Sequence, residues 1–391
     1  MLISFKFNNF CSFNVDSEFS MEAPTGKVKT RFPDNYVSAG NGYDLLKTAV
    51  IVGENAGGKS NFIGSLKFLK GLFDNNLQVQ SIGAYVNSSS LLSDKNPVQS
   101  FEVTFVASGQ KVYKYALSID SKGIVSEGLY KQSKRKATFI TRFLVERGAD
   151  GRYSETEGKT KELTTALKNS NNSYGLFVSK LALLGDEDAI NVADWFKNIL
   201  LPGAVPVDQE NDPARKDEDI RIFKDKKFLD IFRMVDYSID SVEVDPDKPY
   251  SKTLVIRKDA DGNEIKRELQ QDSTGVREFF AWAVQIFRVV YENRVVFADE
   301  MDRVLNPILS DRVVAFVNGT EHRGQFVFST HNVLHLNLKT YMKEQIYFIT
   351  KSKDSLTSEI YSLADFPDVR YETTKVYEFY MKGILGGTAF E

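Results

Sequence analysis

The stretch Gly53-Glu54-Asn55-Ala56-Gly57-Gly58-Lys59-Ser60 has the spacing of a phosphate-binding loop, G-x-x-x-x-G-K-[ST]. Residues 46–52, directly before it, form a short apolar, β-branched run that predicts a buried strand. Residues 61–69, directly after it, carry apolar side chains at helical spacing. Because this motif needs a strand before it and a helix after it, the sequence predicts an α/β nucleotide-binding core.

The chemistry of this loop comes from its glycines, its lysine and its serine. Glycines let backbone N–H groups surround a phosphate, and the start of the following helix favours negative charge. Lys59 can reach the β- and γ-phosphates, and the Ser60 hydroxyl can bind Mg²⁺. The predicted nucleotide-binding residues are Gly53, Glu54, Asn55, Ala56, Gly57, Gly58, Lys59 and Ser60, with Ser60 also a metal ligand.

Length and composition limit the class of protein. A chain of 391 residues exceeds the usual size of a single core, so we expect two lobes or a core with a large insertion. The net charge of −3 argues against a dominant nucleic-acid surface but allows a local basic patch. One cysteine, Cys11, excludes an internal disulfide framework. Since no apolar run approaches the roughly 20 residues needed to span a bilayer, and no signal peptide is recognisable, we expect a cytoplasmic protein without a membrane partner.

The sequence divides into four parts. Residues 1–80 hold two N-terminal strands, the loop and its helix, and form the first part of the nucleotide-binding core. Residues 81–147 alternate in hydrophobicity and predict an antiparallel β part. Residues 148–260 are mostly helical in pattern and predict an inserted helical or lid subdomain. Residues 261–391 return to the core.

Within these parts, the sequence predicts two loops and contains one basic cluster. Residues 21–45 are polar and turn-rich, which predicts an irregular connection. Residues 203–220 are rich in charge and are the best candidate for a mobile loop. The basic cluster at 131–136 fits either a solvated hairpin edge or a DNA contact.

A second motif lies at residues 295–300. The run 295–298 predicts a buried strand, and Asp299 and Glu300 follow it directly, as in a Walker B segment. In such sites the first carboxylate, Asp299, holds the metal and the adjacent Glu300 polarises the attacking water. We therefore predict Asp299 as a metal ligand and Glu300 as a catalytic residue that acts with Lys59.

Two further elements complete the predicted site. His331 follows the apolar strand 325–330 and is placed to contact the γ-phosphate, so we predict it as catalytic, whereas His322 and His335 receive a structural interpretation. Upstream, Ser273 or Thr274 caps an amphipathic helix with Gly275 beside it. A helix start with a hydroxyl and a glycine can bind phosphate.

Taken in order, these motifs resemble those of ATPases of the ABC class. More closely, the chain is similar to the soluble bacterial AAA-type, abortive-infection (phage-defence) ATPases, relatives of the overcoming-lysogenization-defect nucleases and of the RecF and SMC heads. The segments that carry the likeness are MLISFKFNNFCSF (1–13), GENAGGKSN (53–61), DEMD (299–302), LNP (305–307), STH (329–331) and YMKGILGG (380–387). The resemblance implies a P-loop NTPase of ABC-ATPase type: a mixed sheet flanked by helices, with the antiparallel β and lid subdomains. It also implies ATP with Mg²⁺ as cofactors and adds Asn61 to the ATP-binding residues.

The same resemblance implies a homodimer or higher homo-oligomer joined through the ATPase heads. Ser273 and Gly275 of one subunit then complete the γ-phosphate site of the other, and Asp302 lies near the seam. Two features depart from the family pattern: the signature is a short Ser-Thr-Gly, and Asn306 stands where histidine is usual. The candidates for the Q-loop residue are Gln78, Gln80 and Gln99.

Three functions are compatible with these motifs. The first is an ATPase of an anti-phage or toxin-type system that holds, senses for or releases a separate effector, such as a nuclease or toxin. The second is a DNA-repair ATPase that clamps DNA in the manner of RecF. The third, a transporter subunit, fits poorly because a long interval separates Ser60 from Ser273. The lack of heptad repeats and the acidic balance favour the first, and residues 80–260 could serve effector docking, dimer contact or a lid.

Overall fold

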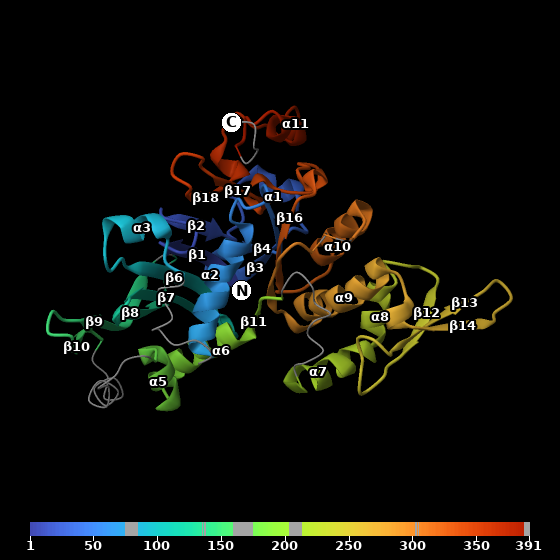
Figure 1. Ribbon diagram of the computed structural model, residues 1–391, viewed down its shortest axis with the longest axis horizontal. Helices are drawn as coiled ribbons and strands as arrows, with labels where there is room; N and C mark the ends of the chain where they lie inside the picture. Colours follow the sequence, from blue (N-terminus) through green and yellow to red (C-terminus); the bar gives the residue numbers. More distant parts are fainter. Residues whose placement is uncertain are drawn as a thin grey trace.

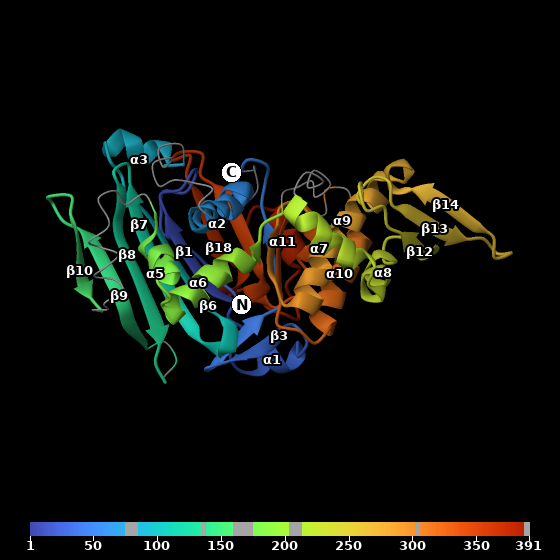
Figure 2. The same ribbon diagram turned by 90° about the horizontal axis from the view of Figure 1, so that it is seen from below.

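Two large sheets, a small distal sheet and a two-stranded sheet, together with helices, make up the part of the chain that the structure describes. The computed structural model describes residues 1–74, 85–134, 136, 138–158, 175–202, 213–301, 303 and 305–386. The antiparallel sheet lies at one end of an elongated molecule and the small sheet β12–β14 at the other, with the parallel sheet between them (Figures 1 and 2). Of the helices within these ranges, none is both long and apolar enough to cross a bilayer.

The first sheet is antiparallel and joins the start of the chain to residues 99–157. Its strands, in spatial order, are β10 (Tyr153–Glu157), β9 (Phe139–Arg147), β8 (Gly123–Gln132), β7 (Val112–Asp120), β6 (Gln99–Val106), β1 (Leu2–Asn8) and β2 (Ser17–Ser20). The sequence division placed β1 and β2 with the core, and here they continue this sheet beside β6. The boundaries near residues 80, 147 and 260 remain predictions.

Helices α5 (Phe177–Leu183) and α6 (Glu187–Asn198) pack against this sheet. The rings of Trp195 and Phe105 stack with centroids 4.3 Å apart. The carboxylate of Glu127, on β8, accepts hydrogen bonds from the N–H groups of Phe177 and Val178 at 2.7 and 2.8 Å. A buried acid on the sheet thus holds the start of α5.

The second sheet is parallel apart from one edge strand. Its order is β11 (Ile199–Leu200), β15 (Val295–Ala298), β16 (Gln325–Thr330), β5 (Thr48–Val52), β17 (Ile346–Lys351) and β18 (Ser358–Ser362). Only β18 runs antiparallel to its neighbour. Side chains alternate between the two faces, and both faces are covered, which is why these strands read as unbroken apolar runs.

Helix α2 (Lys59–Phe73) fills the space between the two large sheets. Phe62 contacts both layers, because its ring centroid lies 6.2 Å from that of Phe5 on β1 and 6.2 Å from that of Phe297 on β15. The opposite face of the parallel sheet is covered by α9 (Thr274–Glu292) and α10 (Pro307–Gly319), which form a second core with it. The phosphate-binding loop therefore sits on a helix that is fixed from two sides.

The remaining elements extend from these layers. They are α1 (Lys27–Arg31), β3 (Tyr36–Gly40), β4 (Tyr43–Leu46), α3 (Ser88–Ser93), α7 (Pro213–Phe223), α8 (Lys226–Phe232), β12 (Ile239–Glu243), β13 (Leu254–Lys258), β14 (Glu264–Glu268) and α11 (Val376–Met381). β12, β13 and β14 form the small distal sheet beside α8 and α9 (Figure 1).

Two expectations about loops were wrong. Residues 21–45 are not an irregular connection, because Asn41 and Gly42, both with positive φ, turn β3 back onto β4 as a hairpin. Residues 213–220 of the expected mobile loop are helical and belong to α7, where Asp219 is buried and pairs with Arg288 at 2.7 Å. The other part of that loop, 203–212, lies outside the described residues.

Candidate functional site

The phosphate-binding loop lies at the carboxyl edge of the parallel sheet. It leaves β5 after Val52 and enters α2 at Lys59. Gly53 passes so close to β17 that an added Cβ would meet the Ile349 carbonyl oxygen at 2.2 Å, and Gly58 has a φ of +120°. Both positions require glycine, and the loop forms the turn that a bound phosphate needs.

Lys59 is buried and already directed into the loop. Its Nζ donates hydrogen bonds to the carbonyl oxygens of Gly53 and Glu54 at 2.7 and 2.9 Å. Ser60, one residue later, is exposed at the helix start. A bound phosphate would therefore replace the two carbonyl oxygens as the hydrogen-bond acceptor of the Lys59 ammonium group. The Ser60 hydroxyl is accessible to a metal.

The outer side of the loop is held by two serines from distant parts of the chain. The Ser358 Oγ, on β18, lies 2.6 Å from the Gly57 carbonyl oxygen and 2.8 Å from the Ser12 Oγ. Asn61 donates a hydrogen bond to the same Ser12 oxygen at 2.8 Å. Asn61 was among the predicted residues, whereas Ser12 and Ser358 were not assigned a role in the site.

The two acids of the Walker B segment follow β15 at the same edge. The Ser329 hydroxyl donates to Asp299 Oδ1 at 2.6 Å and accepts from the Glu300 N–H at 2.8 Å. Glu300 has a φ of +48°, a left-handed conformation that costs energy outside glycine and is held here by that hydrogen bond. Ser329 therefore fixes both acids relative to β16, a role that the sequence did not indicate.

His331 emerges next to Glu300. Its Nε2 lies 3.6 Å from Glu300 Oε1, and the two side chains are 43% and 30% exposed. β16 lies between β15 and β5 in the sheet, so the histidine stands between the acids and the phosphate-binding loop. The other two histidines are buried: His322 contacts the Val317 carbonyl oxygen, and His335 contacts Tyr341 and Ser310.

A cavity of about 390 Å³ opens beside the loop. Its walls are Gly53, Glu54, Asn55, His331, Val333 and Tyr380. Tyr380 comes from α11, and burial together with the neighbouring Glu54 charge raises its pKa to about 12. The segment containing Tyr380 was noted for its family likeness, but no site role was predicted for this residue.

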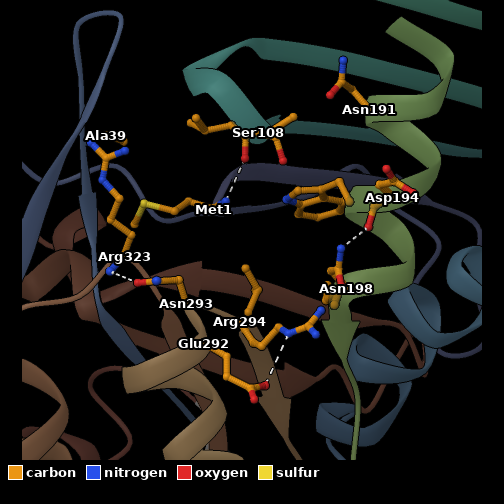
Figure 3. Close-up of a pocket in the computed structure, with 15 residues that line it drawn as sticks. Met1, Ala39, Ser108, Asn191, Asp194, Asn198, Glu292, Asn293, Arg294 and Arg323 are labelled. Atoms are coloured by element: carbon orange, nitrogen blue, oxygen red, sulfur yellow. Dashed lines mark hydrogen bonds and ion pairs between the residues drawn. The ribbon is translucent and has the colours of Figure 1, made fainter. Parts of the chain in front are cut away.

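A larger cavity of about 580 Å³ lies elsewhere (Figure 3). Met1, Trp195, Glu292, Arg294 and Arg323 are among its walls, which lie near the amino ends of the parallel strands. None of the predicted nucleotide residues lines it. The smaller cavity at the carboxyl edge is therefore the candidate nucleotide site, in keeping with the general rule for open α/β sheets.

The predicted signature lies apart from these residues. Ser273 is the N-cap of α9, and its Oγ accepts a hydrogen bond from the Val276 N–H at 3.4 Å. Neither Ser273 nor Gly275 is among the residues that line the described cavity. Asp302 lies outside the described residues, so its place near a seam stays a prediction.

The structure shows the position of Asn306 and of one candidate for the Q-loop residue, Gln99. Asn306 is the N-cap of α10, with its side chain accepting from the Ile308 N–H at 2.9 Å and Pro307 following. Of the Q-loop candidates, Gln99 is buried in β6 and its amide donates to the Asn9 carbonyl oxygen, so it is structural. Gln78 and Gln80 lie outside the described residues.

Two of the four basic residues in the cluster at 131–136 are paired with acids. Lys131 pairs with Asp188 at 2.8 Å, and Lys136 pairs with Glu22 at 2.7 Å. Arg135 lies outside the described residues. These ion pairs favour the solvated-edge interpretation over a DNA contact.

The residues gathered at this edge fit ATP and Mg²⁺. A glycine turn, the Lys59 ammonium and the start of α2 offer donors to a triphosphate. The Ser60 hydroxyl and the Asp299 carboxylate are oxygen ligands of the kind that Mg²⁺ prefers. Glu300 and His331 complete the set on the neighbouring strands.

Comparison with known proteins agrees with this class of site. The family model described as "AAA domain, putative AbiEii toxin, Type IV TA system" matches residues 49–337. No curated protein matches the sequence.

The fold of this chain is similar to that of solved SMC head structures. An SMC head bound to the C-winged helix domain of ScpA is similar with a TM-score of 0.53 and 14% identity, covering 92% of this chain and 97% of that chain. The SMC head domain of Thermotoga maritima gives a TM-score of 0.45 at 14% identity, covering 92% and 98%. The Pyrococcus furiosus Smc head with an extended coiled coil, bound to the C-terminal domain of ScpA, gives 0.47 at 13%, covering 92% and 96%. The predicted α/β P-loop ATPase fold of ABC type is thus confirmed.

Proposed function

The chain belongs to the AAA-domain family described as putative AbiEii toxin of type IV toxin–antitoxin systems, and on that premise we propose a Mg²⁺-dependent ATPase that controls a separate effector. The observation that carries the proposal is the convergence of three strand ends. The loop after β5, the acids after β15 and His331 after β16 meet at one edge of one sheet. The effector is a toxin or nuclease of an anti-phage or toxin-type system.

The proposed mechanism assigns one task to each residue. Lys59 would exchange its loop carbonyl partners for the phosphates, and Ser60 and Asp299 would hold the metal. Bound Mg²⁺ supplies charge neutralisation to the triphosphate. Glu300 accepts a proton from water at its carboxylate, and Ser329 holds the backbone of Glu300 through its N–H. His331, next to Glu300, responds to the γ-phosphate.

We further propose that the working unit is a head-to-head homodimer or higher homo-oligomer. The support is that the Ser273 helix start lines no part of the described cavity beside the loop. In this arrangement Ser273 and Gly275 of a second copy approach the γ-phosphate side. ATP then joins the heads, hydrolysis separates them, and the change of state holds or releases the effector.

The test of this function uses the protein encoded beside this gene. The two proteins are co-expressed in bacteria, and growth and phage plaque formation are measured with the wild type, Lys59→Ala and Glu300→Gln. We expect both variants to change toxicity or phage protection, and Lys353→Ala, an exposed lysine in the β17–β18 connection, to behave as the wild type.

The alternative is a DNA-repair ATPase. The ion pairs of Lys131 and Lys136 weaken it, because they leave less free positive charge on that surface. Hydrolysis that is stimulated by DNA ends, together with no effect of the neighbouring protein, would favour the repair function instead.

A further inference from the structure

The C-terminal helix α11 forms one wall of the candidate nucleotide cavity. Tyr380 is 6% exposed and lines the cavity together with Gly53, Glu54 and His331. We propose that Tyr380 is an ATP-binding residue that closes the γ-phosphate end of the site with its phenol group. The inference rests on the proposed ATP binding and adds a residue to that same site.

The position of the Tyr380 ring is linked directly to the loop. Its ring stacks on Phe348 of β17, with centroids 5.7 Å apart and an interplanar angle of 21°. Phe348 pairs in register with Val52, the last residue of β5 before Gly53. One strand pair therefore connects the start of the loop to the ring on which Tyr380 stacks.

The helix that carries Tyr380 is anchored beyond the cavity. The Tyr361 hydroxyl, on β18, donates a hydrogen bond to the Leu385 carbonyl oxygen at 2.6 Å. The Ile384 N–H donates to the Phe379 carbonyl oxygen at 3.0 Å, which closes the turn after α11. The first bond ties the segment after α11 to β18 and the second fixes the turn itself, so the phenol has a defined position.

The chemistry of the cavity explains why a tyrosine suits this place. A triphosphate needs hydrogen-bond donors, and Glu54 on the same wall is an acid that cannot donate when ionised. Burial and the Glu54 charge keep the pKa of Tyr380 at about 12, so the phenol remains a neutral donor near pH 7. Glu54, Asn55 and His331 surround the end of the cavity that we assign to the γ-phosphate.

The test compares ATP and ADP binding by calorimetry, in the Glu300→Gln background so that ATP persists. Tyr380→Phe keeps the stacked ring and removes only the hydroxyl. We expect its Kd for ATP to rise about tenfold, as for loss of one hydrogen bond to a charged group, and its Kd for ADP to stay within about twofold. Tyr377→Phe, on the same helix with a 46% exposed side chain, is the matched control and should change neither.

Two results would overturn the inference: an unchanged ATP affinity of Tyr380→Phe, or an equal weakening of ATP and ADP. Failure of the wild type to bind ATP at all would instead refute the proposed function. If Tyr380→Phe does not fold, amide hydrogen exchange of the unmodified chain decides the matter. ATP must then slow exchange across Val376–Met381 more than ADP does, and equal exchange rates refute the role of Tyr380.

Discussion

Replacement of Ser329 by alanine tests whether one hydroxyl positions both acids of the site. Ser329 is fully buried, donates to Asp299 Oδ1 and accepts from the Glu300 N–H. A hydrogen bond to a carboxylate contributes about 1.5–3 kcal/mol and a neutral one about 0.5–1.5 kcal/mol. Because Asp299 and Glu300 are only half-buried, water can replace part of what is lost. We expect the free energy of unfolding to fall by about 2 kcal/mol, the lower end of that sum.

The effect on turnover should exceed the effect on stability. Removal of the Ser329 hydroxyl takes away the hydrogen bond that ties the left-handed backbone of Glu300 to β16. A displacement of a catalytic group by about 1 Å can reduce the rate about a hundredfold, so we expect kcat to fall by about ten- to a hundredfold. ATP affinity should change little, because Lys59 and the loop are unaffected.

The measurements are urea unfolding followed by circular dichroism, and phosphate release at saturating ATP and Mg²⁺. Ser65→Ala is the control, since Ser65 is equally buried but its hydroxyl donates only to the Phe62 carbonyl oxygen within α2. A Ser329→Ala variant with wild-type kcat would refute the positioning role, whatever its stability.

Three further predictions concern the site and its support. Lys59→Ala should abolish ATP binding in calorimetry. Glu300→Gln should bind ATP, hydrolyse it at least about a hundredfold more slowly than the wild type, and accumulate the closed dimer in size-exclusion chromatography. Turnover of Glu300→Gln at the wild-type rate would exclude Glu300 as the base. Lys59→Ala and Ser273→Arg should each be inactive alone and regain phosphate release when mixed, because one mixed site then holds an intact loop and an intact signature; no recovery would argue against a shared site. Burial raises the pKa of Glu127 to about 7 from 4.5, so the contribution of Glu127 to the free energy of unfolding is present below pH 4.5 and is lost as the pH rises through 7, by about 3 kcal/mol. Urea unfolding of Glu127→Gln between pH 5 and 8 should lack this loss. If the free energy of unfolding of the variant falls with pH as steeply as that of the wild type, the prediction is wrong.

The sequence predicted those parts of the fold and the candidate site that depend on local pattern. The strands before Gly53, Asp299 and His331 are short apolar runs, and parallel packing brings their ends together without further information. The hairpin at Asn41-Gly42 was also readable from its turn residues, but the surrounding glycines hid it.

The support of the site could not be predicted because it depends on contacts between distant segments. Ser358 and Tyr380 reach the loop only through the pairing of β17 with β5 and β18. The sequence of helix α7 is charged and therefore resembled a loop. The helix is held by the buried pair of Asp219 with Arg288, and these residues lie about 70 positions apart in the sequence. β14 was missed because its side chains are charged and exposed.

The attachment of the loop to Ser12 and Ser358 has a consequence for how the protein is made. The loop and β5 are synthesised early, but β17 and β18 follow some 300 residues later. Until the ribosome has released those strands, Gly53 lacks the β17 backbone on which it packs, and Gly57 lacks its serine contact. A nascent chain therefore cannot form the complete candidate nucleotide site before β17 and β18 have left the ribosome.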